Sequence, residues 1–172
     1  MMKSITRRGH RTSQRNTEKL IVNRRARFDY ELGEELVVGL VLTGAEVKSA
    51  RFGRVRLRGS YVVPRRGALV NRPELYLLNA QFTLQNNARQ ADNATVVDSR
   101  ERKILATRQQ IDRFIAAKNS GLTIIPTKLL PTGHFIKLVI ALGRGKKNYD
   151  KRATIRENDL RRENAKFIKR AR

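Results

Sequence analysis

Short runs of apolar residues dominate the middle of the chain and predict strands. The clearest is residues 36–42, an almost unbroken apolar run that ends at Thr43 and Gly44 and is typical of a buried strand. The Pro-Thr-Gly sequence at residues 131–133 predicts a hairpin turn into the last run. The other runs lie at residues 75–78, 122–125 and 135–142.

Apolar and basic residues alternate from residue 54 to residue 59, which predicts a half-buried strand with a basic outer face. We expect residues 61–63 to continue this strand before Pro64 and a loop at residues 65–67. The inward positions would be Val55, Leu57 and Gly59, and the outward positions Arg54, Arg56 and Arg58.

Two segments predict helices. Thr107 and Gln110 form a capping-box pattern, and Gly121 marks the stop of the helix that follows. The apolar face of this helix would carry Ile111, Phe114 and Ile115. Residues 45–52 predict a shorter helix that ends at Gly53.

Several short strands, glycine corners and two small helices predict a mainly β fold with flanking helices, built as a closed or nearly closed antiparallel β-barrel. A barrel of about 120 residues can bury a core by itself. Residues 85–98 are polar and contain three Asn, so we expect a mobile loop there.

The composition adds a large positive charge to this picture. Among 172 residues, 38 are Lys or Arg and 15 are Asp or Glu, which gives a formal net charge of +23. Such an excess is most easily tolerated beside a polyanion, so nucleic acid is the first candidate partner and an anionic membrane surface the second. The absence of Trp and an aromatic content of 6% weaken the membrane alternative.

Several other classes of protein are excluded or disfavoured by composition. The absence of Cys excludes a disulfide scaffold, a thiolate zinc site and a cysteine nucleophile. No apolar run approaches the ~20 residues that a membrane span needs, and residues 1–22 lack the apolar stretch of a secretory signal. We therefore expect a soluble, cytoplasmic protein without a metal or other cofactor.

The distribution of charge suggests three parts. Residues 1–22 are basic and polar without an apolar period, and we expect a disordered N-terminal extension. Residues 23–142 hold the predicted barrel. Residues 143–172 carry 12 basic and four acidic residues and form a basic C-terminal tail.

No motif for catalysis stands out. Residues 143–147 resemble a phosphate-binding loop only superficially, because Ile140 stands where a Walker loop needs its first Gly and Lys147 where it needs Ser or Thr. His134 lies in the predicted turn, without an orienting partner that would make it a general base. We expect a protein that is not an enzyme.

Three clusters of basic residues lie beside apolar or aromatic residues. Cationic side chains bind phosphate oxygens and aromatic faces stack on unpaired bases, so this combination predicts an RNA-binding surface. The alternative is a solvated charged face, with Phe28 and Tyr30 in the core. The clusters are Arg24, Arg25 and Arg27 before Phe28; Arg100, Arg102 and Lys103 before Leu105; and Lys146, Lys147, Lys151 and Arg152 around Tyr149.

The last segment has the pattern of a marginal helix. Thr154 and Glu157 form another capping-box pattern. Leu160, Phe167 and Ile168 can share one helix side amid basic residues, but this stripe is too narrow to hold an ~18-residue helix in water. We expect the tail to become helical on binding RNA. Docking of the stripe on the barrel is the alternative.

Five stretches of sequence occur in the order found in one known family. The second and the last together are highly specific. From about residue 22 to residue 172 the chain closely resembles the bacterial SsrA-binding proteins, also called small protein B. The stretches are residues 23–30 (Asn-Arg-Arg-Ala-Arg-Phe-Asp-Tyr), 42–49 (Leu-Thr-Gly-Ala-Glu-Val-Lys-Ser), 60–62, 78–80 and 145–152 (Gly-Lys-Lys-Asn-Tyr-Asp-Lys-Arg).

The resemblance implies a β-barrel related to the oligonucleotide-binding fold. It implies binding to the tRNA-like domain of transfer-messenger RNA and entry with that RNA into stalled bacterial ribosomes. The body of the protein would replace the missing anticodon arm, and the tail would probe the small-subunit decoding centre and the empty mRNA channel. The nascent chain would then be tagged for proteolysis, with no bond chemistry by the protein, which we expect to be a monomer when free.

The resemblance also assigns residues. Asn23 and Leu105 match family positions implicated in RNA binding. Tyr149 stands where some relatives have His, and Leu160 where relatives can have Trp. Phe167 and Ile168 match an apolar pair of the tail, and the hinge into the tail matches at Gly145, Lys146, Lys147, Asp150, Lys151 and Arg152.

The chain departs from the family pattern at three places. Val37 aligns with a glutamate of the relatives, and Ser99 replaces a proline, which leaves its loop less rigid. Residues 70–74 look like a small insertion in a hairpin.

Two other functions compete with a trans-translation factor. A structural ribosomal protein would also be small, basic and tailed, but it would associate with a ribosomal subunit in fixed stoichiometry. An RNA-modifying enzyme would need a cofactor pocket or catalytic carboxylates, for which the sequence offers no candidates.

Overall fold

The computed structural model describes residues 20–66, 72–85, 95–131, 133–147, 149–152, 156, 159–160 and 163–164. Its helices are α1 (Arg24–Asp29), α2 (Gly44–Arg51) and α3 (Arg108–Asn119). Its strands are β1 (Ile21–Val22), β2 (Tyr30–Leu40), β3 (Val55–Arg56), β4 (Tyr61–Arg66), β5 (Pro73–Leu78), β6 (Gln81–Gln85), β7 (Thr95–Asp98), β8 (Arg102–Leu105), β9 (Thr123–Leu130) and β10 (Lys137–Gly145).

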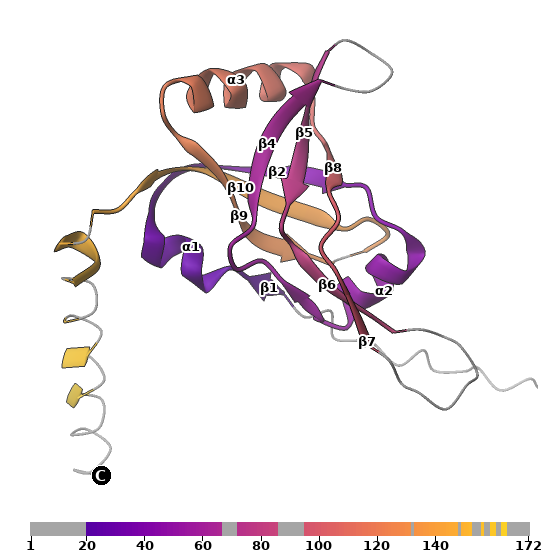
Figure 1. Ribbon diagram of the computed structural model, residues 1–172, viewed down its shortest axis with the longest axis horizontal. Coiled ribbons are helices and arrows are strands. Elements are labelled where there is room, and N and C mark those ends of the chain that lie inside the picture. Colours follow the sequence, from indigo (N-terminus) through magenta and orange to yellow (C-terminus); the bar gives the residue numbers. More distant parts are fainter. Residues whose placement is uncertain are drawn as a thin grey trace, which may run out of the picture.

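The larger sheet curls until its edges meet (Figure 1). Its strand order is β1-β9-β10-β2-β8-β5-β4, and β4 also pairs with β9 through Val62 and Ile124. Six antiparallel strands therefore form a ring, with β1 as an added edge strand. This confirms the prediction of a mainly antiparallel β fold with flanking helices. A second, three-stranded sheet has the order β3-β6-β7.

The core fills the inside of the ring. Alternate residues of the strands point inward, as the period of two requires. Leu75, Leu77, Ile124, Leu138 and Ile140 are wholly buried. Phe114 adds the apolar face of α3, which packs against β9 and β5. Each such side chain contributes roughly 1.5–3 kcal/mol when fully buried.

The strand β2 begins six residues earlier than the apolar run predicts. The first half of β2 is polar on its outer face, which obscures the alternation of apolar and polar residues. This half nevertheless pairs with the C-terminal end of β10, as far as Tyr30 opposite Gly145. The run is also less buried than expected, because Val37 is 52% exposed while Val38 is buried.

The predicted strand over residues 54–63 is wrong as a single element. Gly59, with φ +75°, turns the chain between β3 and β4, and the two strands join different sheets. The inward and outward alternation is confirmed from Arg54 to Arg58, because Val55 and Leu57 are buried and the arginines beside them are exposed. The predicted inward position of Gly59 is wrong, because this residue is exposed in the turn. β4 then runs through Pro64, whose register partner is Leu75 of β5.

The expectation of a loop over residues 85–98 is corrected in part. Residues 95–98 form β7, which pairs with β6 from Phe82 opposite Asp98 to Gln85 opposite Thr95. Residues 86–94 lie outside the described part of the chain. The strand was hidden because only two apolar residues, Val96 and Val97, mark it, and both are exposed.

Both predicted helices are present. Thr107 is the N-cap of α3, and its backbone N–H donates to the Gln110 side chain at 2.9 Å. α2 has a capping box of its own between Thr43 and Glu46. The first helix, α1, was missed, because half of its six residues are arginine and it shows no apolar period. Asn23 caps it by accepting a hydrogen bond from the Ala26 backbone.

The predicted N-terminal extension, residues 1–22, is described only from residue 20. Past β10 the chain enters a helical turn at residues 149–152, on the same side of the molecule as α1 (Figure 1). Within the described residues, no helix is long and apolar enough to cross a membrane.

Candidate nucleic-acid interface

Asn23 is buried at the junction of three elements. Its side-chain nitrogen donates to the carbonyls of Leu57 (3.0 Å) and Pro126 (2.9 Å), and its oxygen caps α1. The residue is only 6% exposed. This corrects the expectation that its amide contacts RNA, because every polar atom of the side chain is used inside the protein. We assign Asn23 a positioning role for α1.

The arginines of α1 differ in their surroundings. Arg25 donates to Asp29 at 2.7 Å, and its guanidinium lies 4.7 Å from the centre of the Phe28 ring. Arg24 and Arg27 are exposed and form no ion pair within the described residues. These two side chains are therefore exposed to solvent, and their contact with RNA stays a prediction.

The second predicted cluster is mostly neutralised. Arg102 is wholly buried, donates to Glu46 at 2.9 Å, and covers the Phe82 ring at 4.0 Å. Arg100 binds both oxygens of the same carboxylate, at 2.8 and 2.5 Å. Arg102 therefore cannot contact RNA in this fold, which corrects its assignment. Together these groups fasten α2 to β8.

The charge state of this buried cluster is fixed by its partners. Burial acts to raise the pKa of Glu46, but hydrogen bonds from Arg100 and the Thr43 backbone, with the charge of Arg102, outweigh it. The pKa of Glu46 is thus held below its ordinary value of 4.5, and the carboxylate stays ionised.

Lys103 is also paired with an acid. Its amino group lies 2.5 Å from Glu74, which accepts a further hydrogen bond from Tyr76 at 2.9 Å. The hydrogen bond to Glu74 raises the pKa of Lys103. Lys103 is therefore a partly exposed cation with most of its field cancelled locally.

Leu105 lies in an exposed apolar patch. It is 53% exposed and pairs with Gly39, whose missing side chain leaves room for it: a Cβ there would lie 3.2 Å from the Leu105 Cβ. Val37 and Val41 lie two positions either side of Gly39 and share its face, exposed by 52% and 44%. Val37, which the resemblance aligns with a glutamate of the relatives, lies within this patch.

The hinge into the tail is tied to α1 through Asp29. The backbone of Lys146 donates to the Asp29 carbonyl at 2.9 Å, and Lys151 lies 3.3 Å from the Asp29 carboxylate, which also binds Arg25. Partial burial acts to raise the pKa of Asp29, but Arg25 and Lys151 outweigh it and hold the pKa below its ordinary value.

The remaining hinge and tail residues are placed as follows. Lys147 donates from its backbone to Asp150 at 3.2 Å, and its amino group lies 6.0 Å from the centre of the Tyr149 ring. Tyr149 and Leu160 are 66% and 61% exposed, so neither is packed away. Gly145 ends β10 and Arg152 is exposed, while Phe167 and Ile168 lie outside the described residues.

One basic feature was seen in the sequence but not assigned to the site. Arg56 and Arg58 line a cleft of about 460 Å³ between β3 and α1, together with Arg24, Arg25 and Phe28. The sequence placed these arginines on an outer face, but it could not show that α1 lies opposite them.

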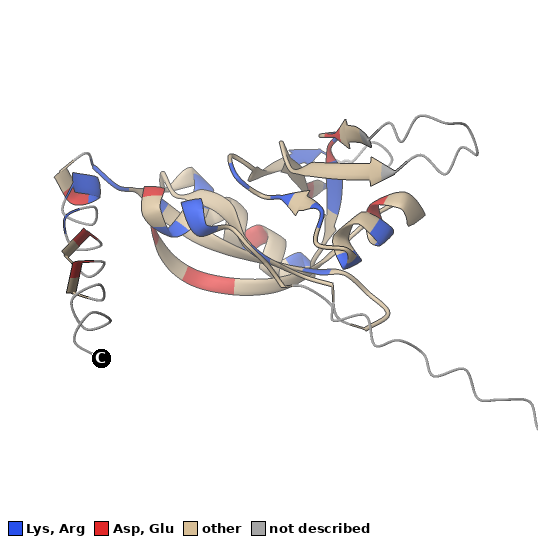
Figure 2. Ribbon diagram, turned by 90° about the horizontal axis from the view of Figure 1, so that it is seen from below, with Lys and Arg blue, Asp and Glu red and all other residues tan. Residues whose placement is uncertain are grey.

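The site is rich in cationic side chains. Within the described residues, no cluster of three His, Asp or Glu could hold a metal ion. Lys and Arg positions are scattered over the body and also occur at the start of the tail, with Asp and Glu positions among them (Figure 2). The fold and this surface define the class: a small, β-rich, strongly basic protein.

Comparison with known proteins identifies the family. The SmpB protein family model matches residues 20–170, so the chain belongs to the SmpB family. The SsrA-binding protein of Magnetococcus marinus is 41% identical over 148 residues, which cover 86% of this chain and 93% of that protein. The SsrA-binding protein of Parabacteroides distasonis is 40% identical over 152 residues, which cover 87% of this chain and 94% of that protein.

A solved structure supports the same relationship. It is described as "tmRNA-SmpB: a journey to the center of the bacterial ribosome" and matches with a TM-score of 0.57 and 34% sequence identity. The match covers 75% of this chain and 85% of the solved chain.

Proposed function

We propose that this chain is an RNA-binding factor of trans-translation. It binds the tRNA-like domain of transfer-messenger RNA and delivers that RNA to stalled ribosomes. Its tail enters the small-subunit decoding centre and the empty mRNA channel, and the nascent chain is tagged as a result. The observation that carries this proposal is the family match over residues 20–170.

The fold supports this function in two ways. The ring presents arginines without acidic partners on α1 and an exposed apolar patch at Leu105. The tail begins directly beside α1, where Lys151 and Asp29 pair. An RNA bound at α1 would therefore lie next to the start of the tail, which suits a protein that couples RNA delivery to a test of the mRNA channel.

We propose three functional parts along the chain: a basic extension at residues 1–22, an RNA-binding body at residues 23–142, and a ribosome-binding tail at residues 143–172. The protein would perform no bond chemistry itself and would work in the cytoplasm. Removal of residues 153–172 should preserve binding to transfer-messenger RNA but abolish peptide tagging in a reconstituted translation system. Equal loss of both would contradict this division.

A structural ribosomal protein remains the competing function. The two are separated by purifying the full chain from a bacterium that makes transfer-messenger RNA and sequencing the RNA that accompanies it. We expect transfer-messenger RNA to be enriched far above ribosomal RNA. Enrichment of one ribosomal subunit in fixed stoichiometry, without transfer-messenger RNA, would refute our proposal.

A further inference from the structure

The cleft between β3 and α1 has the size and chemistry of a nucleotide site. Its volume of about 460 Å³ falls within the roughly 300–1,000 Å³ of ordinary ligand pockets. Its floor is apolar, formed by β1 and the inward residues of β3, and its walls carry guanidinium groups. The lining includes Ile21, Val55, Leu57, Arg24, Arg56 and Arg58.

Two walls of the cleft carry positive charge without an acidic partner. Arg56 ends β3 and Arg58 lies in the turn after the buried Leu57, and both line the cleft. Neither they nor Arg24 across the cleft form an ion pair within the described residues. Like charges facing one another raise the free energy of the empty cleft, and an anion bound among them relieves this.

The third wall is aromatic. Phe28 lines the cleft, and the guanidinium of Arg25 lies over its ring at 4.7 Å. A stacked arginine and phenylalanine form a flat platform, and such surfaces accept unpaired bases of any sequence.

The frame of the cleft is rigid. Asn23, at the start of α1, donates to the Leu57 carbonyl that lies between Arg56 and Arg58. The same amide also holds the Pro126 carbonyl of β9. The two charged walls are therefore held at a fixed separation by one buried side chain, which is the preorganisation that a specific site needs.

We infer that this cleft holds one unpaired nucleotide of the bound RNA. Its phosphate lies among Arg24, Arg56 and Arg58, and its base packs on the Phe28–Arg25 platform. This inference rests on the proposed function and adds Arg56 and Arg58, which lie outside the basic clusters that the sequence identified, to the first of those clusters.

The charge part is tested by the double variant Arg56→Gln/Arg58→Gln in the full-length protein. The measurement is affinity for the tRNA-like domain of transfer-messenger RNA across a salt series. We expect affinity to fall about 10-fold or more, with the slope of log affinity against log salt reduced by about 1, because both arginines neutralise the same phosphate and each phosphate contributes about 1 to the slope.

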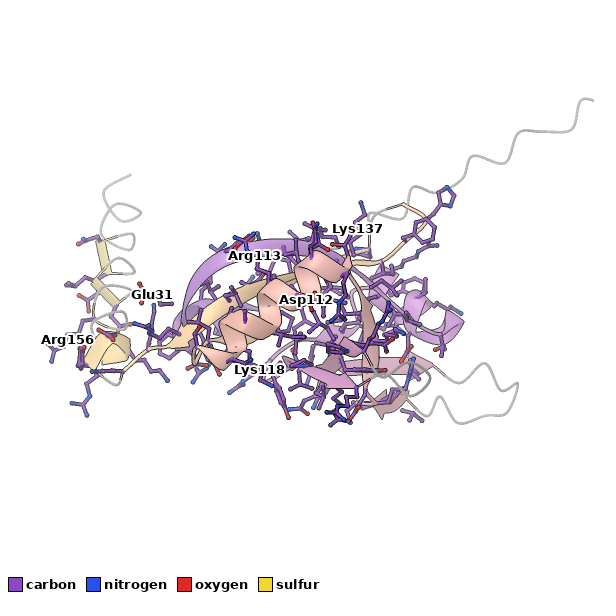
Figure 3. All side chains as sticks on the ribbon, turned by 90° about the horizontal axis from the view of Figure 1, so that it is seen from above. Glu31, Asp112, Arg113, Lys118, Lys137 and Arg156 are labelled. Carbon is purple, nitrogen blue, oxygen red and sulfur yellow. The ribbon has the colours of Figure 1, made fainter. Side chains whose placement is uncertain are left out.

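The matched control is Arg108→Gln/Arg113→Gln on α3. It also removes two positive charges, but these arginines are paired with Asp112 and Glu34 at 2.8 and 2.7 Å. Figure 3 shows Asp112 and Arg113 on the outward face of that helix. We expect less than about 3-fold change here, because paired surface charges contribute little. Equal losses in both double variants, or no loss in the cleft variant, would overturn the subsite.

The stacking part is tested by Phe28→Leu against Phe52→Leu. Phe52 is an exposed ring that also carries an arginine, Arg54, at 5.4 Å, but it lies outside the cleft. We expect Phe28→Leu to weaken binding about 5-fold or more and Phe52→Leu to have no measurable effect. Equal effects would refute the base platform. If the unaltered protein failed to bind this RNA, the proposed function would fall first, and the subsite with it.

Discussion

Two arginine-rich regions of this protein differ in burial and in ion pairing. At the corner between α2 and β8, Arg100 and Arg102 share the buried carboxylate of Glu46, and Arg102 has no exposed surface. At the cleft between α1 and β3, Arg24, Arg56 and Arg58 are exposed and unpaired within the described residues. The first region holds the fold together, and the second is left charged for a ligand.

The difference shows that the role of a basic cluster depends on which acidic side chains lie beside it in the fold. Glu46 lies 54 and 56 residues before Arg100 and Arg102 in the sequence, so no local pattern joins them. An unpaired buried charge raises the free energy of the folded state. In so basic a chain, the positions of the few carboxylates therefore decide which arginines can be buried. The first two predictions below test the neutralised region, and the last two test the open one.

The largest effect is expected for Glu46→Gln. It removes the buried partner of Arg102 at 2.9 Å and leaves, within the described residues, only the partly exposed Asp98 at 3.4 Å, which costs up to about 3–5 kcal/mol of unfolding free energy. Chemical denaturation monitored by circular dichroism measures this. Any RNA affinity measured where the variant is still folded should be close to normal. A stable variant with weak RNA binding would reverse the roles of the two regions.

Acid should reproduce this loss gradually. The pKa of Glu46 in the folded protein lies below its ordinary value of 4.5. Its contribution to stability is therefore complete above about pH 4.5 and is lost as pH falls through the lower, folded pKa. A denaturation series over acidic pH should show a stability decrease in the parent that is smaller in Glu46→Gln. Identical pH profiles for both proteins would contradict the buried pair.

Asn23→Ala should have an intermediate effect on two quantities together. It removes two buried hydrogen bonds and the cap of α1, which costs roughly 1–3 kcal/mol of stability. RNA affinity should fall as well, because the walls of the cleft are no longer held at a fixed separation. Thermal melts and binding isotherms measure the two. Weaker RNA binding with an unchanged melting temperature would instead indicate that Asn23 contacts the RNA directly.

The smallest effect is expected for Asp29→Asn, which releases Arg25 and Lys151 from their shared carboxylate. Freed cations beside the cleft should strengthen RNA binding by roughly 2–5-fold, corresponding to ~0.5–1 kcal/mol for one exposed pair. Asp112→Asn, which releases Arg108 on α3, is the control and should leave affinity unchanged. Unchanged or weaker binding by Asp29→Asn would mean that this carboxylate does not limit the RNA surface.

The sequence predicted the parts of the fold that depend on local pattern. The strand runs, the helix at Thr107 and the hairpin turn before β10 follow from periodicity, capping and turn chemistry. It could not separate β3 from β4, because both continue one alternating pattern across Gly59. It also missed β7, whose apolar residues are exposed in a small second sheet.

The sequence predicted the type of ligand at the candidate site but not which residues form the site. Residue type and charge indicated RNA, and the family motifs indicated which RNA. The same motifs include Asn23 and Glu46, whose side chains are buried and bind other parts of the protein. Arg56 and Arg58 lie outside the quoted motifs, and only the placement of α1 opposite β3 gathers them into a cleft.

The most direct test of this contrast is arginine modification with phenylglyoxal, mapped by mass spectrometry with and without transfer-messenger RNA. Arg24, Arg56 and Arg58 should react in the free protein and be protected in the complex. Arg102, which has no exposed surface, should stay unmodified in both. Modification of Arg56 and Arg58 that is unchanged by RNA, or ready modification of Arg102 in the free protein, would contradict the division between ligand-binding and fold-holding arginines.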